Sequence, residues 1–307
     1  MLMSSHPFVQ RYRDYLMLHF VILIWGFTGI LGKVITVPYF SIVIYRMGIA
    51  FVGLFLFFLW KKRKFETNKK AIAKFMLVGI IVGAHWATFF QALKVSNVSV
   101  VLTTLASTSL FVAFLEPLFF KRRVIPYEVF FGLVGIAGLY LIFNFESQFQ
   151  LGIMLALCSS FCAALFGTLN GILVRDAAPG QITMYEMLGG LMAMALYTLL
   201  YENVQPGDLS PSFLDLAFLL ILGLVCTAFA FVTSVQIVKV LSPFTVSISI
   251  NMEPIYAIVL ALLIFGESEK MTSGFYLGAT LILSTVIGNG AIKAYYKKRQ
   301  RKLNIQV

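Results

Sequence analysis

Arg46, Glu186 and Glu253 are ionisable side chains that lie inside long apolar segments of the sequence. Placing a charged residue at the centre of a membrane span costs about 2.5–3.5 kcal/mol, and such residues often mark pathways for ions or solutes. We therefore treat the three as candidates for coupling or gating. Arg46 could also contact a substrate carboxylate, and structural ion pairs between helices are the alternative for Arg46 and Glu186.

Glu253 is followed directly by a proline in one of the last apolar segments. Pro254 removes a backbone donor and frees the carbonyl group of Ile250, which opens the helix locally. Asn251 lies beside this opening and offers an amide to a polar substrate. Two interpretations of Glu253 follow. It binds a substrate amine or carries a proton, or it is a buried acid that holds a kink.

His85, Trp86, Phe89 and Gln91 are candidates for the wall of a substrate cavity. His85 and Phe89 are four residues apart and therefore share one face of a helix. Trp25 begins a similar spacing in the first apolar segment. Aromatic side chains can stack on substrate rings or cover a cation. The alternative is helix packing, with the glycines near Trp25 allowing a close approach.

Hydroxyl and amide side chains recur deep in the apolar segments. Thr104, Ser107 and Thr108 lie at helical spacing in the fourth segment, and Asn170 lies in the sixth. We expect these groups to bind a polar metabolite by hydrogen bonds. Hydroxyl groups can also bond to carbonyl groups of their own helix, so both interpretations stay open.

The elements that position these residues are about ten apolar segments. About 20 residues at a rise of 1.5 Å cross a hydrocarbon core of about 30 Å. Hydrophobic residues make up 60% of the chain and charged residues only 12%, against about 25% charged residues in soluble domains. The sequence therefore predicts an all-α integral membrane protein. The predicted spans are 15–36, 39–60, 71–93, 98–120, 127–144, 151–174, 181–201, 213–238, 244–265 and 272–292.

Basic residues gather in every second break between these spans. Of the 24 Lys and Arg residues, all but Lys33, Arg46, Lys94 and Lys270 fall on one side of the predicted membrane. Because Lys and Arg of short loops stay in the cytoplasm, we expect both termini there. We predict a multi-pass protein of the cell membrane (inner or plasma), with a cytoplasmic segment 1–14 and a basic cytoplasmic tail 293–307.

Several other classes of protein do not fit this sequence. The net charge of +11 lies in short loops rather than on one surface, so we expect the lipid bilayer as partner and no nucleic acid. Cys158 and Cys162 have no His or carboxylate nearby to complete a metal site. Phosphate-binding loops and nucleophile elbows are absent, so we predict no catalytic residues and no cofactor. A membrane-embedded enzyme acting on a lipid or small hydrophobic substrate is the alternative class.

The chain also matches itself. Four matches in the same order indicate an internal repeat. Each copy, 15–146 and 150–292, holds about five spans, and this odd number inverts the second copy in the membrane. Inverted repeats are typical of secondary transporters, whose halves exchange conformations around a central site. The matches are Trp25-Gly26 with Phe166-Gly167, Tyr45-Arg46-Met47 with Tyr185-Glu186-Met187, Lys94-Val95 with Lys239-Val240, and Phe120 with Phe265.

Short motifs recur along nearly the whole chain: Trp25-Gly26, Tyr45-Arg46, Phe90-Gln91-Ala92-Leu93-Lys94, Glu253-Pro254 and Phe265-Gly266-Glu267. With these motifs the sequence resembles the EamA-type transporters of the drug/metabolite transporter superfamily. The first copy departs from the pattern, with Lys121-Arg122-Arg123 where Gly-Glu is usual.

The resemblance implies two inverted five-helix repeats around a central cavity. From it we expect a secondary transporter, an exporter by alternating access, with a small-molecule substrate such as an amino acid. A homodimer is compatible with this plan.

Overall fold

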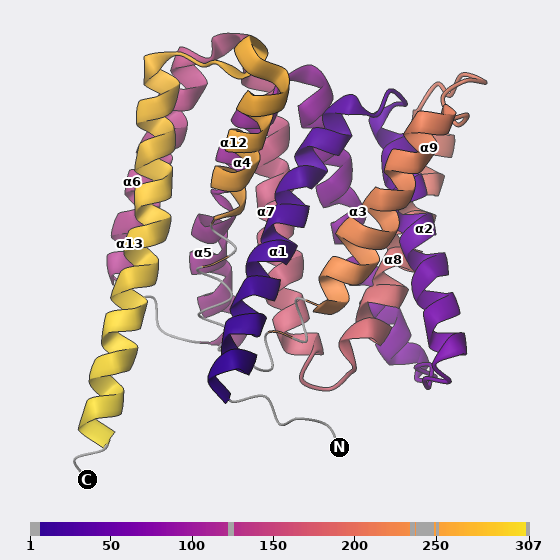
Figure 1. The fold of residues 1–307 in the computed structure, drawn as a ribbon, viewed down its shortest axis with the longest axis horizontal. Coiled ribbons are helices and arrows are strands. Elements are labelled where there is room, and N and C mark those ends of the chain that lie inside the picture. Colours follow the sequence, from indigo (N-terminus) through magenta and orange to yellow (C-terminus); the bar gives the residue numbers. More distant parts are fainter. Residues whose placement is uncertain (1–6, 122–125, 234–236, 238–248, 250–251, 305–307) are drawn as a thin grey trace.

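The computed structural model describes residues 7–121, 126–233, 237, 249 and 252–304, and every regular element among them is a helix (Figure 1). Short 3-10 helices, η1 (Ser147–Phe149) and η3 (Gly266–Glu269), connect longer ones. The longer helices are α1 (Pro7–Val34), α2 (Tyr39–Trp60), α3 (Lys69–Val95), α4 (Val98–Leu105), α5 (Thr108–Phe120), α6 (Pro126–Phe145), α7 (Gln150–Leu173), α8 (Pro179–Tyr201), α9 (Phe213–Leu220), which continues as the π-helix η2 (Ile221–Phe229), α12 (Glu253–Phe265) and α13 (Ser273–Asn304).

Eight of the described segments are long and apolar enough to cross a membrane. Helix α6 contains a shorter apolar stretch, Phe130–Phe145, and α12 is the described part of the ninth predicted span. The prediction of an all-α membrane protein is confirmed. Two helices run further than predicted. Helix α1 begins at Pro7, and α13 continues through the basic tail to Asn304.

Polar residues at the turns determine where several helices begin. Asn68, Asn97 and Ser212 each accept a hydrogen bond from a backbone amide in the first turn of α3, α4 and α9. Such a cap stabilises a helix by about 1 kcal/mol. Pro179 occupies the start of α8, where its missing N–H leaves no hydrogen bond unmade.

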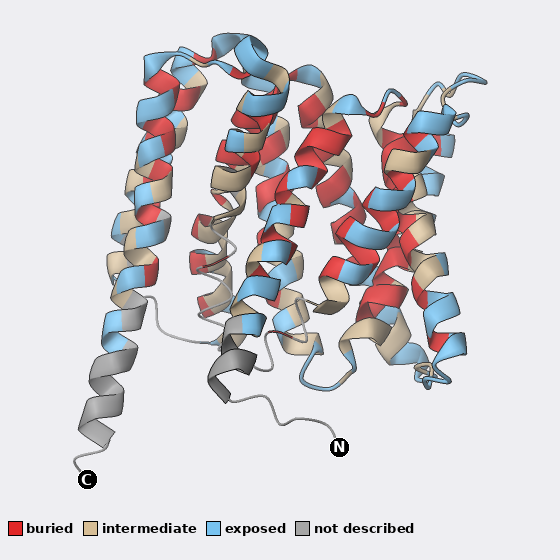
Figure 2. Cartoon of the chain, viewed as in Figure 1, coloured by how far each residue is buried: buried red, intermediate tan, exposed pale blue. Residues whose placement is uncertain are grey.

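Close backbone contacts hold α3 against α8 in the middle of the bundle. A Cβ atom at Gly79 would lie 2.1 Å from the carbonyl oxygen of Glu186, and one at Gly189 would lie 2.4 Å from that of Met76. In lipid, helices associate through such close packing rather than through the hydrophobic effect. Figure 2 shows buried residues concentrated in this part of the bundle and fewer along α13.

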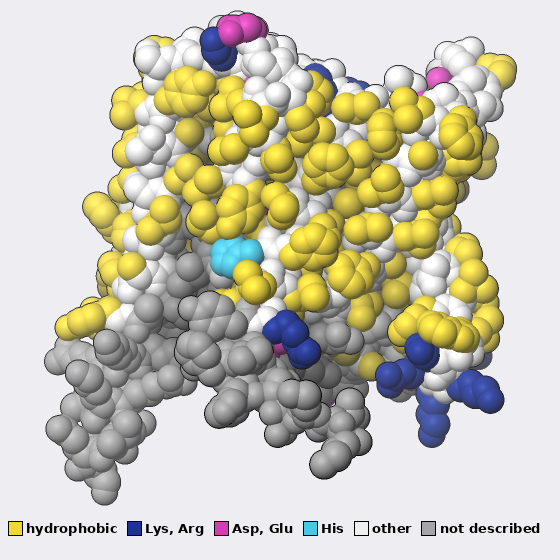
Figure 3. All heavy atoms as spheres, viewed as in Figure 1, with side chains coloured by type: hydrophobic (Ala, Val, Ile, Leu, Met, Phe, Trp, Pro, Cys, Tyr) yellow, Lys and Arg dark blue, Asp and Glu magenta, His cyan; other side chains and the backbone are white. Residues whose placement is uncertain are grey.

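The outer surface of the bundle is apolar, as expected for contact with lipid. Figure 3 shows hydrophobic side chains over its flank, with the larger groups of Lys and Arg at the lower edge. We call this edge, which holds the start of α1 and the turn 61–68, the basic end. The other end, with the turns 35–38 and 202–212, is the opposite end.

The two repeats run in opposite directions. Helix α1 starts at the basic end, and near its other end the Lys33 ammonium donates to the Leu93 carbonyl group at 3.0 Å. Helix α7, by contrast, starts at the opposite end. A Cβ atom at Gly152, near the start of α7, would lie 2.5 Å from Ser96, which is close to Lys33 at the end of α1. The first helices of the two copies are therefore antiparallel, which is the inversion predicted from the odd number of spans.

The fourth span is interrupted in its middle, although the sequence predicts it as one continuous helix. The amide of Ser107 donates to the Thr104 carbonyl group at 3.0 Å, a three-residue spacing that separates α4 from α5. In the second copy, 145 residues further on, the amide of Met252 donates to the Ser249 carbonyl group at 2.9 Å, just before α12. The two copies thus share a three-residue hydrogen bond at equivalent positions, which separates α4 from α5 in the first copy and precedes α12 in the second.

Candidate functional site

Arg46 lies in the interior of the bundle, on the face of α2 that packs against η2. Only 2% of its surface is exposed. Its Nε donates a hydrogen bond to Thr227 Oγ1 at 2.8 Å, and its guanidinium carbon lies 4.0 Å from the centre of the Trp86 ring. Thr227 in turn donates to the Leu222 carbonyl group at 2.8 Å, the five-residue spacing of the π-helix. This π-helix therefore sets the position of Thr227 opposite Arg46.

The guanidinium group of Arg46 is only partly satisfied. Its Nη1 is buried and has no hydrogen-bond partner. Glu253, the first residue of α12, is close enough to interact with Arg46 electrostatically. A buried polar donor without a partner costs about 1–3 kcal/mol, and more when it is charged. The arrangement is thus suited to an additional acceptor.

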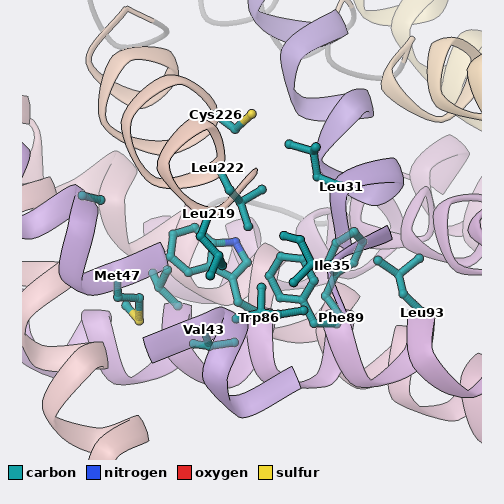
Figure 4. Packing of buried hydrophobic residues seen from close by; sticks show 14 of the residues in the cluster. Leu31, Ile35, Val43, Met47, Trp86, Phe89, Leu93, Leu219, Leu222 and Cys226 are labelled. Carbon is teal, nitrogen blue, oxygen red and sulfur yellow. The ribbon is translucent and has the colours of Figure 1, made fainter. Parts of the chain in front are cut away.

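A group of aromatic rings reaches this arginine through Trp86, which stacks on its guanidinium group. Trp86 and Trp25 both pack edge-on against Phe231, with ring centres 6.2 and 5.9 Å away. Figure 4 shows Trp86 amid buried side chains that include Val43 and Leu219. The indole Nε1 of Trp25 is buried and has no hydrogen-bond partner. Arg46, Trp86, Phe231 and Trp25 therefore form one aromatic cluster. It contains two buried donors without partners, Arg46 Nη1 and Trp25 Nε1.

Sequence reasoning singled out neither Thr227 nor Phe231. Phe231 stands 145 residues after Trp86, the offset at which Lys239 follows Lys94, so the internal repeat carried a signal for it. Thr227 has no comparable signal, because its contact with Arg46 depends on the local π-helix.

Glu186 occupies the position in α8 that corresponds to Arg46 in α2. It is fully buried, and neither carboxylate oxygen has a hydrogen-bond partner. The side chain of Asn170 on α7 lies beside it, and its Oδ1 is likewise buried without a partner. The structure thus brings together two of the predicted site residues, Glu186 and Asn170.

Arg46 and Glu186 lie at different depths. Each is seven residues into its helix, which corresponds to about 10 Å at 1.5 Å per residue. Helix α2 begins at the opposite end and α8 at the basic end (Figure 1). The two charges therefore lie on either side of the midplane.

His85 faces α7 rather than Arg46. Its Nδ1 lies 2.8 Å from Ser159 Oγ and 3.0 Å from the Ser159 carbonyl oxygen, and its ring packs against Phe166 and Phe89. Phe89 is buried in the core, and Gln91 is half-buried on α3. Of the four residues predicted to form this wall, the structure places Trp86 against Arg46.

The hydroxyl groups around the interruption of the fourth span differ in their hydrogen-bond partners. Thr104 and Ser107 have buried hydroxyl oxygens without hydrogen-bond partners. Thr108 instead donates to the Leu105 carbonyl group at 2.7 Å, within its own helix. Asn251, the remaining predicted contact, lies outside the described residues.

A shallow apolar groove lies on the flank of the bundle near this cluster. It has a volume of about 230 Å³ and is formed by α1, η2 and α12. Cys226 lines it and is also close enough to Arg46 to interact electrostatically. The described residues contain no group of three His, Cys, Asp or Glu side chains that could hold a metal ion. The groove is lined by Leu23, Ile24, Phe27, Ile221, Val225, Cys226 and Leu260.

The protein is an all-helical bundle of two inverted copies with unpaired polar groups buried inside. This is the architecture of a multi-pass membrane transport protein. The model of the EamA-like transporter family matches this sequence twice, over residues 13–144 and 150–290. The chain belongs to the EamA-like transporter family.

One crystal structure of a protein is similar in fold to this chain. It aligns with a TM-score of 0.62 and 16% sequence identity over 90% of this chain and 97% of its own. No curated protein matches the sequence.

Proposed function

We propose that this protein is a secondary transporter that moves a small organic metabolite by alternating access. The observation that carries this proposal is the interruption of the fourth span at 104–107, which is matched in the second copy by the hydrogen bond from Met252 to Ser249 at the start of α12. In secondary transporters, interrupted helices at corresponding positions of two inverted halves build the substrate site near the midplane. A membrane scaffold would gain nothing from interrupting a helix at depth.

The charge distribution supports an orientation with the basic end in the cytoplasm. Lys61, Lys62, Arg63 and Lys64 are all exposed in the turn that follows α2. Short loops with such clusters are retained on the cytoplasmic side of the cell membrane. Since α1 starts and α13 ends at this end (Figure 1), both termini are cytoplasmic in this proposal.

We propose that the solute is amphoteric, like an amino acid, and that the protein exports it. Arg46 supplies a positive charge, while Glu253 and Glu186 supply carboxylates inside the same bundle. Glu253 interacts with Arg46 electrostatically, so protonation of Glu253 would free Arg46 for a bound solute. This exchange of partners would couple a proton to transport.

Counterflow in liposomes tests the proposal. Purified protein should exchange a labelled solute from an amino-acid mixture for the unlabelled solute without chemical change. Recovery of a modified product would instead support the alternative, a membrane-embedded enzyme acting on a lipid or small hydrophobic substrate. Absence of exchange across a broad metabolite mixture, with folded protein in both orientations, would contradict transport.

A further inference from the structure

We infer that Arg46 binds the carboxylate group of an organic monocarboxylate, whose body packs against Trp25, Trp86 and Phe231. This inference rests on the proposed transport function and names the chemical class of its substrate. The first support is the state of Arg46 itself. Its Nε donates to Thr227 and its guanidinium group stacks on Trp86, and these two contacts fix the group. Its Nη1 nevertheless has no hydrogen-bond partner.

A fixed arginine with a free N–H is prepared for an anion. The hydrogen bond to Thr227 and the stacking on Trp86 restrict the guanidinium group before any ligand arrives, so less entropy is lost on binding. A carboxylate at Nη1 would satisfy the donor and neutralise the charge in a site of low dielectric constant. Without such an acceptor, Arg46 remains a buried cation with one N–H group that makes no hydrogen bond.

The chemistry of the surroundings favours a carboxylate over a phosphate. A phosphate monoester carries about two negative charges near neutral pH, and Arg46 is the only cation that the described part of this cluster offers. A single guanidinium group matches one carboxylate. Glu253 would further repel a doubly charged group from the same space.

The walls of the cluster indicate what the rest of the solute looks like. Trp25, Trp86 and Phe231 present aromatic surface, which favours an apolar or aromatic body. The unpartnered Trp25 Nε1 can donate to a second acceptor on the same molecule. An organic acid with an apolar or aromatic body meets all of these requirements.

The three tryptophans allow binding to be measured directly. Trp60 is 73% exposed at the end of α2, while Trp25 and Trp86 belong to the cluster. In a Trp60→Phe background, indole fluorescence therefore reports the cluster. The probes are four acid–amide pairs: acetate and acetamide, isovalerate and isovaleramide, phenylacetate and phenylacetamide, and L-phenylalanine and L-phenylalaninamide. The apparent melting temperature in detergent gives a second, independent signal of binding.

We expect the acid of at least one pair to bind about tenfold more tightly than its amide, the size of effect typical for a charged hydrogen bond. Equal binding of acid and amide in every pair, or no binding by any acid, would overturn the inference. Tighter binding of phenyl phosphate than of phenylacetate would overturn it as well, in favour of a phosphate site.

Variants locate the effect. Arg46→Gln should lower affinity for the acid about tenfold and leave the amide unchanged. The matched control is Arg175→Gln, which removes an exposed arginine stacked on Phe120 outside the cluster. Because loss of Arg46 could impair folding, Trp25→Phe provides a milder variant that keeps an aromatic side chain and removes the free indole N–H. It should weaken acid binding about fivefold.

The failure of this inference differs from the failure of the proposed function. If counterflow proceeds but the Arg46→Gln protein binds acids as well as the wild type does, transport stands and the carboxylate site is wrong. If acids bind through Arg46 but no solute is exchanged, the binding site stands and the transport proposal is wrong.

Discussion

The contact between α3 and α8 gives a prediction whose size follows from the structure. In a Gly79→Ala variant, the new Cβ atom would lie 2.1 Å from the carbonyl oxygen of Glu186, whereas carbon–oxygen contacts are normally about 3.3 Å. The helices must therefore separate by about 1 Å. Overpacking of this kind costs about 1–3 kcal/mol, and the cost falls at the upper end because the obstacle is backbone.

The better helix propensity of alanine offsets about 1 kcal/mol of this cost. We therefore expect the free energy of unfolding to fall by about 2 kcal/mol. Gly167→Ala is the matched control, since a Cβ atom there would meet nothing within 4 Å, and it should be stabilising by up to about 1 kcal/mol. The measurement is equilibrium unfolding in mixed detergent micelles for both variants. If Gly79→Ala unfolds at the same denaturant concentration as Gly167→Ala, the close backbone contact between α3 and α8 is wrong.

Three further predictions address the opposite end, the orientation and the coupling. Glu269 is buried and accepts hydrogen bonds from the first two amides of α4 at 3.1 and 2.7 Å; Glu269→Gln should cost about 1 kcal/mol in unfolding free energy, and an unchanged value would contradict this cap. In a cysteine-free background, a cysteine at Gln205 should react with an impermeant thiol reagent in intact cells, and one at Thr67 only after lysis; the reverse result would invert the proposed orientation. Glu253→Gln should abolish pH-driven accumulation but retain exchange in liposomes, whereas normal accumulation would exclude proton coupling by Glu253.

The sequence predicted the helices better than their interruptions. Apolar segments of about 20 residues define membrane spans through length and composition alone, and eight of the described segments form helices long and apolar enough to cross a membrane. The break between Thr104 and Ser107 contains no proline, so no local residue type announced it. It became visible only as a backbone hydrogen bond that matches its counterpart at Ser249 and Met252.

Side-chain partners were harder to predict for a similar reason. The burial of Arg46 followed from its place in an apolar span, but its contact with Thr227 depends on the register of a π-helix. Likewise, His85 and Trp86 are adjacent in the sequence, yet one faces Ser159 and the other faces Arg46. Adjacent residues on a helix point about 100° apart, and only the packing of α3 shows which neighbour each one meets.

The two copies share a backbone arrangement but differ in charge. A Cβ atom at Gly79 would meet the carbonyl oxygen of Glu186, and one at Gly223 would meet that of Arg46 at 3.2 Å, so the two charged residues occupy equivalent places in the two halves. A perfectly symmetric protein would hold a solute equally well in both orientations of its halves. Arg46 would attract an anionic group on one side of the midplane, and an ionised Glu186 would repel it on the other. Because the charges differ between the halves, the two conformations of the alternating-access cycle that we propose would bind a carboxylate with unequal affinity.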